Sequence, residues 1–208
     1  MTSQAVEPAL QVIGTMAFAI SGTAAAARRE FDWFAAVALG TVVAVGGGTV
    51  RDALLGVPAS WIFHWWPLAV AATTAVLTIP VVHHLGSDVD EWRIVLLADA
   101  LGLAVFTVLG ADRASHLGAP LLTAALLGSL TGVAGGVMRD VLCGTTPVVF
   151  SGQIYALASL LGAALYATLR ALGADPALTY WLPVLGIVAI RLLALRRAWS
   201  VPAVRGVT

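Results

Sequence analysis

Long apolar stretches separated by short polar connections follow one another along the whole chain. A helix that crosses a bilayer needs about 20 mostly apolar residues, because each residue advances the helix by about 1.5 Å. Seven stretches meet that length approximately and predict seven transmembrane helices: 9–27, 34–52, 66–84, 93–110, 118–140, 152–171 and 177–195. The pattern predicts an all-α integral membrane protein in which residues 1–208 form a single transmembrane domain.

The composition agrees with a chain that lies in lipid. Apolar residues make up 60% of the sequence and charged residues only 11%, and the mean hydropathy is +0.94. A soluble domain carries roughly 25% charged residues and cannot hide so much apolar surface. These figures argue against a soluble enzyme, a nucleic-acid-binding protein and a disordered chain. The partner that they predict is the lipid bilayer, with no nucleic acid.

The arginines indicate how the chain is oriented. All eleven basic residues are arginine, and cytoplasmic loops are the ones enriched in them. An outside N-terminus places six arginines on the inner side: Arg28, Arg29, Arg93, Arg196, Arg197 and Arg205. It places only Arg113 and Arg170 on the outer side. The sequence therefore predicts a multi-pass protein with its N-terminus outside and its C-terminus in the cytoplasm.

The sequence repeats itself after 88 residues. Between Gly40 and Gly56, eight of seventeen positions match the residue 88 positions later, and the matches include the rare charges of an Arg-Asp pair. The repeats cover about 9–84 and about 93–171, and the helix at about 177–195 lies outside them. Three spans in each copy turn the second copy upside down, and inverted repeats commonly build a transport pathway at their interface.

Glycine clusters occupy matching places in the second and fifth predicted spans. The clusters are Gly46, Gly47 and Gly48 in one copy and Gly135 and Gly136 in the other. Glycine weakens a helix and lets the backbone bend, which predicts kinks that line a pathway. Close helix packing is the alternative role, and it explains three further glycines fully: Gly40, Gly128 and Gly132.

An Arg-Asp pair follows each glycine cluster. The pairs are Arg51–Asp52 and Arg139–Asp140. Ionisable residues inside a membrane are candidates for function, although arginines near a span end can also reach the headgroups. Neighbours on a helix point about 100° apart, so we expect the pairs to exchange partners, Arg51 with Asp140 and Arg139 with Asp52.

Three more polar residues are candidates for the pathway. They are Asp99, Ser21 and Thr49. Asp99 has an alternative role as an interfacial residue, and each hydroxyl can instead bond to its own helix. No nucleophile and base are spaced for catalysis, so we expect no enzyme and no catalytic residue. The single cysteine and four histidines at span ends predict no metal site and no cofactor.

The segments GGGTVRDALLG and GGVMRDVLCG resemble the prokaryotic TRIC family, the trimeric intracellular cation channels. They are also similar to related bacterial inner-membrane proteins described as glycine-transporter-like. The resemblance covers essentially the whole chain. It implies a homotrimer in the prokaryotic plasma membrane, in which each subunit has its own pore between helices one, two, four and five. It also implies that monovalent cations, chiefly potassium, permeate, with sodium a possible second ion.

The resemblance assigns roles to residues already singled out. It implies kinks at the two glycine clusters, and it makes pore charges of Arg51, Asp52, Arg139 and Asp140. Animal members carry a lysine-containing motif in helix two that is absent here, so phosphoinositide regulation does not carry over.

Two functions therefore remain open at the level of sequence. The first is a potassium-permeable channel. The second is a secondary transporter for a small solute such as glycine, because inverted repeats with interrupted helices suit alternating access equally well. A membrane scaffold is the weakest reading, because it leaves the repeated charges unexplained.

Overall fold

The computed structural model describes residues 3–85, 91–151 and 153–200, and this part of the chain is helical. Arg205, one of the arginines used to predict orientation, lies outside the described residues. The elements are α1 Ser3–Ala27, α2 Trp33–Leu54, α3 Ser60–Phe63, α4 Trp66–Leu85, α5 Glu91–His116, α6 Leu121–Leu142, the 3-10 helix η2 Val148–Phe150, α7 Ala156–Ala171 and α8 Pro176–Arg196. Their order matches the predicted spans, with the short α3 and η2 as additions.

Six helices of the described chain are long and apolar enough to cross a membrane. The remaining long helix, α7, has 16 residues and so extends about 24 Å, less than the roughly 30 Å of a bilayer's hydrocarbon core. The predicted span at 152–171 began too early, because Gln153 forms an isolated bridge with Ser200 and the α-helix starts only at Ala156. The count of seven spans stays a prediction.

Large apolar side chains are exposed in the middle of the helices. Leu130 of α6 is 52% exposed, Leu161 of α7 53% and Leu185 of α8 61%. Lipid tails are as apolar as leucine, so these faces are stable in a bilayer, whereas in water each would lose the benefit of burial. With its apolar helices, the exposed surface is that of a multi-pass membrane protein.

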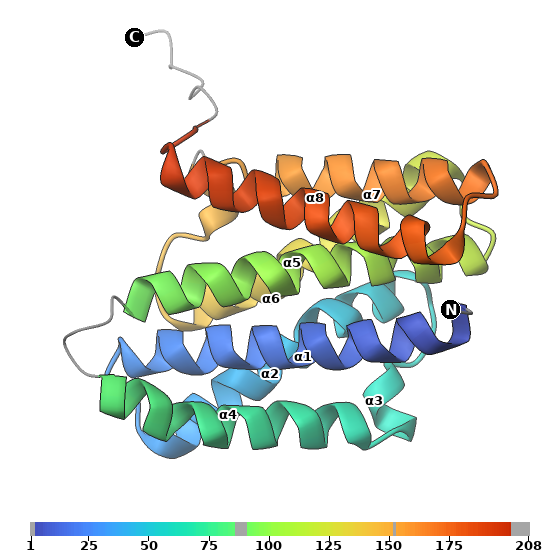
Figure 1. The fold of residues 1–208 in the computed structure, drawn as a ribbon. Coiled ribbons are helices and arrows are strands. Elements are labelled where there is room, and N and C mark those ends of the chain that lie inside the picture. Colours follow the sequence, from blue (N-terminus) through green and yellow to red (C-terminus); the bar gives the residue numbers. More distant parts are fainter. Residues whose placement is uncertain (1–2, 86–90, 152, 201–208) are drawn as a thin grey trace, which may run out of the picture.

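Helices α1 and α5 lie side by side in the middle of the molecule (Figure 1). Helix α1 also packs against α2 and α4, while α5 packs against α6, α7 and α8. Helix α2 meets α6 directly. The centre of this bundle contains a stacked pair of rings, Phe18 of α1 and Phe106 of α5, whose centroids are 5.3 Å apart.

The glycine clusters lie where α2 and α6 touch. A Cβ atom on Gly47 would overlap the carbonyl oxygen of Thr131, and one on Gly135 would lie 3.0 Å from the carbonyl oxygen of Val43. Both helices continue without interruption through their clusters. At Gly47 and Gly135 the absence of a side chain therefore has a packing role. The predicted bends stay a prediction.

Contacts at the centre come in exchanged pairs. Gly47 approaches Thr131 while Gly135 approaches Val43, and each partner lies 88 residues from its counterpart, since 43 + 88 = 131 and 47 + 88 = 135. Contacts that exchange in this way are those that a two-fold axis produces. The stacked Phe18 and Phe106 are likewise 88 residues apart.

The segments after α2 and α6 also share their geometry. Gly56 and Gly144 both have a positive φ, 67° and 64°, a backbone conformation that side chains disfavour. Each turn ends with a backbone amide that binds the preceding aspartate: Ser60 N lies 3.1 Å from Asp52 Oδ2, and Val148 N lies 2.9 Å from Asp140 Oδ2. These bonds fix both carboxylates at the ends of their helices.

Candidate functional site

A buried ion cluster surrounds Arg139 where α1, α5 and α6 meet. The guanidinium donates from Nη1 to Asp99 Oδ1 and to Ser21 Oγ, both at 2.6 Å. Its Nε donates to Asp140 Oδ1 at 2.9 Å. Arg139 and Asp99 are both fully buried. Because a buried charge is stable only when it is paired, this cluster holds two carboxylates and one guanidinium in a single closed group.

Tyr155 closes the cluster from the segment before α7. Its hydroxyl donates to Asp99 Oδ1 at 3.1 Å. Gly136 makes room for this contact, because a Cβ atom there would overlap the Tyr155 hydroxyl and lie 2.9 Å from Asp99 Oδ1. The second glycine cluster thus has two packing roles, one against α2 and one against the ion cluster.

The predicted exchange of partners between the two Arg-Asp pairs is wrong. Arg51 binds its own neighbour, with Nη2 2.7 Å from Asp52 Oδ1, and Arg139 does the same, with Nη2 2.8 Å from Asp140 Oδ1. The three-carbon stem of arginine lets the guanidinium curl back over the angle between adjacent residues. Each aspartate directs its other oxygen to a backbone amide, which leaves none for a partner in the other repeat.

The two arginines nevertheless differ in their surroundings. Arg139 is bound by Asp99, while the residue 88 positions before Asp99 is the neutral Gln11. Gln11 and Arg51 line the same cavity, and Arg51 retains 8% exposure. The arginine of the second repeat, Arg139, is therefore held by side chains of neighbouring helices, and we call it locked. The arginine of the first repeat, Arg51, lies beside a cavity.

That space, the Arg51 cavity, has a volume of about 460 Å³. It is bounded by the start of α1, the end of α2, the α3 region and α5, and its lining includes Glu7, Gln11, Arg51 and Arg113. A separate small cavity of about 10 Å³ shares Gln11 and Arg51 with it and is also lined by Gly48 and Phe106. One ring of the stacked phenylalanine pair therefore borders this small cavity.

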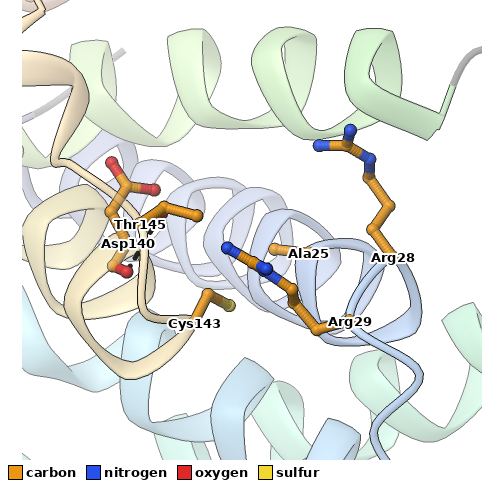
Figure 2. Close-up of a pocket in the computed structure, with 6 residues that line it drawn as sticks. All are labelled: Ala25, Arg28, Arg29, Asp140, Cys143 and Thr145. Carbon is orange, nitrogen blue, oxygen red and sulfur yellow. Dashed lines mark hydrogen bonds between the residues drawn. The ribbon is translucent and has the colours of Figure 1, made fainter.

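A second cavity, the Asp140 cavity, has a volume of about 300 Å³. Arg28 and Arg29 line it from the end of α1, and Asp140, Cys143 and Thr145 line it from the end of α6 (Figure 2). The Asp140 cavity lies about 26 Å along α1 from the Arg51 cavity, taking 1.5 Å for each residue between Pro8 and Ala25.

The predicted polar residues divide into two groups. Asp99 and Ser21 belong to the Arg139 cluster, so the interfacial alternative for Asp99 is wrong: the side chain is fully buried and ion-paired. Thr49 does not join this cluster. Its hydroxyl donates to Val45 O in its own helix and accepts a hydrogen bond from Trp61 Nε1 at 2.9 Å, which anchors α3.

Sequence reasoning passed over Arg191, which is also fully buried. It donates to the carbonyl oxygen of Ile154 at 2.9 Å, and its guanidinium lies 4.7 Å from the centre of the Tyr155 ring. Arg191 therefore supports the tyrosine that binds Asp99. An arginine inside the predicted span at 177–195 was a signal in the sequence, because a charge within a span requires a partner.

Comparison with known families gives a decisive match. The model of a family described as "Glycine transporter" matches residues 8–83 and 96–171, nearly three quarters of the chain. The chain belongs to the glycine transporter family. The two matched segments are themselves 88 residues apart, and each of them contains one Arg-Asp pair. Arg191 lies beyond both.

Curated relatives within this family are described only as membrane proteins. The UPF0126 inner membrane protein YadS of Escherichia coli strain K12 is 41% identical over 160 residues, which cover 76% of each chain. A UPF0126 membrane protein of Vibrio cholerae is 36% identical over 194 residues, covering 93% of this chain and 80% of the relative.

Solved structures connect this glycine transporter family member to TRIC channels. A TRIC trimeric intracellular cation channel orthologue from Rhodobacter sphaeroides has a TM-score of 0.87 and 35% identity, covering 93% of this chain and 99% of that one. A prokaryotic TRIC channel in 0.5 M KCl has a TM-score of 0.88 and 28% identity, covering 94% and 98%. The chain therefore has the TRIC fold, as its sequence motifs predict.

The described residues of this family member offer no site for a multivalent metal. No group of three or more histidine, cysteine, aspartate or glutamate side chains within them is arranged to hold a metal ion. The charged groups at the centre are carboxylates already bound to arginine. This arrangement holds a cationic group, the Arg139 guanidinium, between carboxylates.

Proposed function

We propose that this protein is a channel for monovalent cations, permeable to potassium, with a pore in each subunit between α1, α2, α5 and α6. The observation that carries the proposal is the placement of two cavities at opposite ends of α1, with the Arg139 cluster and the Phe18–Phe106 stack between them. The TRIC fold of the chain supports it. The structure then represents a closed pore with two wide mouths.

The arginines in this pathway need not repel cations. Arg51 is neutralised by Asp52, and Arg139 by Asp99 and Asp140. Opposite charges at such short distances cancel most of each other's field beyond a few ångströms. In a closed pore Arg139 acts as the plug, and its two carboxylates become available to a cation when it withdraws.

The architecture that accompanies this proposal has two inverted repeats. The exchanged contacts of Gly47 and Gly135 support a two-fold axis, as do the two family matches at the same 88-residue spacing. We take α7 together with η2, which precedes it in the chain, as the seventh span. This gives an outside N-terminus and a cytoplasmic C-terminus in a prokaryotic inner membrane. The relatives that form trimers make a homotrimer the expected assembly.

Reconstitution of the purified protein into planar bilayers tests the proposal directly. We expect discrete, ohmic currents in KCl and NaCl that disappear when both cations are replaced by N-methylglucamine. Protein-free bilayers prepared in the same detergent are the control. Absence of unitary currents from folded protein in KCl would exclude the channel.

A transporter for glycine is the second candidate, and a specific observation favours it. Arg113 lines one cavity and Arg29 the other, and a guanidinium group binds a carboxylate well. Saturable uptake of radiolabelled glycine by proteoliposomes, without unitary currents, would favour this function over the channel.

The single cysteine provides a test of the Asp140 cavity. In the proposed orientation, Cys143 opens toward the cytoplasm, so a membrane-impermeant thiol reagent should label it in inverted vesicles and not in spheroplasts. Burial raises the pKa of the Cys143 thiol above its usual value. Because the thiolate is the reactive form, the labelling rate should rise about tenfold per pH unit from pH 7 to 8. Mass spectrometry of the intact protein measures it.

The same modification should alter conduction. A positively charged methanethiosulfonate group on Cys143 places a cation beside Asp140 in the cavity, so potassium current should fall severalfold. Cys143→Ser is the matched control and should conduct normally and resist the reagent. Labelling only from the outer side would contradict the orientation, and full labelling with unchanged current would remove this cavity from the pathway.

A further inference from the structure

Oxygen atoms of three side chains surround the Arg139 guanidinium. Asp99 Oδ1, Asp140 Oδ1 and Ser21 Oγ all lie 2.6–2.9 Å from nitrogen atoms of the guanidinium. The three oxygens come from three helices, α5, α6 and α1. Carboxylate and hydroxyl oxygens converging on one positive group are also what a small inorganic cation requires.

The Arg139 guanidinium does not bind both carboxylate oxygens of Asp99. The side chain is fully buried, and among the described residues its second oxygen, Oδ2, has no hydrogen-bond partner. A buried carboxylate oxygen without a partner carries a free-energy cost. This group of oxygens therefore retains capacity for a cation that coordinates Asp99 through both oxygens.

We propose that the side chain of Arg139 occupies a binding site for a monovalent cation, and that a potassium or sodium ion takes its place when Arg139 withdraws. Arg139 is then a tethered substitute for the permeant ion. This inference rests on the proposed channel function for its physiological meaning, while the site itself rests on the contacts of Asp99, Asp140 and Ser21.

The charges around the site favour a monovalent ion. Asp99 and Asp140 supply two negative charges, and Arg191, stacked on Tyr155 beside them, supplies one positive charge. Without Arg139 the net charge is −1, which one monovalent cation neutralises. A divalent ion would instead leave the buried site with a net charge of +1. The charge of the site therefore favours a monovalent ion over calcium.

The other repeat provides a built-in comparison. Within the described residues the acidic partner of Arg51 is Asp52 alone, and Gln11 stands where the second repeat has Asp99. Removal of Arg51 leaves one carboxylate next to a wide cavity, instead of two in a buried cluster. Arg51→Gln is therefore a matched control for Arg139→Gln.

Thermal unfolding of purified variants tests cation binding at the site and does not depend on measuring channel currents. Tryptophan fluorescence would follow unfolding of the full chain in detergent, in about 150 mM KCl, NaCl or choline chloride. For Arg139→Gln we expect Tm to be about 3–6 °C higher in KCl or NaCl than in choline, the shift that a Kd near 10 mM would give. Wild type and Arg51→Gln should differ between these salts by less than about 1 °C.

Asp99 should be essential for that shift. The double variant Arg139→Gln/Asp99→Asn removes the central ligand, and its Tm should no longer depend on the cation. If Arg139→Gln is recovered folded only from potassium or sodium buffers, that also supports the site. If it is not recovered in any salt, Arg139→Gln/Asp140→Asn relieves the excess charge and should keep a smaller cation-dependent shift.

Three results would overturn the inference. They are equal Tm values for Arg139→Gln in KCl and choline, an equal cation shift in Arg51→Gln, and a larger shift with about 2 mM CaCl2 than with KCl. Failure of the channel proposal is a separate result: a silent bilayer together with a cation-dependent Tm would leave the site intact and remove only its role in permeation.

Discussion

Replacing Arg139 by alanine should raise the open probability of the channel about tenfold or more. In the closed structure Arg139 donates two hydrogen bonds at 2.6 Å, one of them to the buried carboxylate of Asp99. A hydrogen bond to a charged group contributes about 1.5–3 kcal/mol, and about 1.4 kcal/mol corresponds to a factor of ten. Opening a pore that lacks Arg139 does not break these bonds. Single-channel recording in symmetrical KCl measures the change.

Arg51→Ala is the control for this prediction. Arg51 is bound to its own neighbour, Asp52, and lines the wide Arg51 cavity, so its loss should change open probability by less than about threefold. Equal effects of the two variants would mean that the difference between a locked and a cavity-lining arginine has no role in gating. Unchanged records for both would remove the arginines from the mechanism.

Gly47→Ala should cause a large loss of stability. A Cβ atom at Gly47 would overlap the carbonyl oxygen of Thr131, which belongs to the backbone of α6 and cannot move without the helix. Overpacking of a rigid contact costs about 1–3 kcal/mol and occasionally more. We expect a Tm about 5 °C or more below wild type, or loss of folded protein from the membrane fraction.

The adjacent glycine gives the matched control. At Gly48 the nearest atom to an added Cβ is Arg51 Nη2, at 3.8 Å, which is ordinary contact with a mobile side chain. Alanine also favours a helix over glycine by about 1 kcal/mol. Gly48→Ala should therefore keep or slightly raise Tm. Similar losses at both positions would show that flexibility of the cluster, and not the α2–α6 contact, is what the glycines provide.

Much of the fold could be predicted from the sequence, because its signals are local. A run of about 20 apolar residues can be recognised as a helix in lipid without knowing which other helices it packs against. The 88-residue repeat can likewise be detected in the sequence alone, and its matching positions include the two Arg-Asp pairs. The helix ends were less accurate: α7 starts only at Ala156, after Gln153 has formed a bridge with Ser200, and apolar content does not reveal a contact between distant residues.

The partners of the charges could not be predicted in the same way. The helical angle between Arg51 and Asp52 suggested that neighbours do not pair, yet the flexible arginine stem closes both pairs locally. Asp99 and Ser21 were recognised as polar residues within spans, but their convergence on Arg139 depends on how α1, α5 and α6 pack. Arg191 carried a signal that only its contact with Tyr155 explains.

By itself, the sequence determined the membrane environment, the helices, the repeat and the small set of charges within it, since each follows from the chemistry of residues at fixed spacing. The tertiary structure decided which of two equivalent arginines is locked. Part of that difference arises from a substitution between the repeats, Gln11 against Asp99, and its effect depends on a distance of 2.6 Å between helices. Burial makes that distance matter, because a charge removed from water is stable only beside an opposite one.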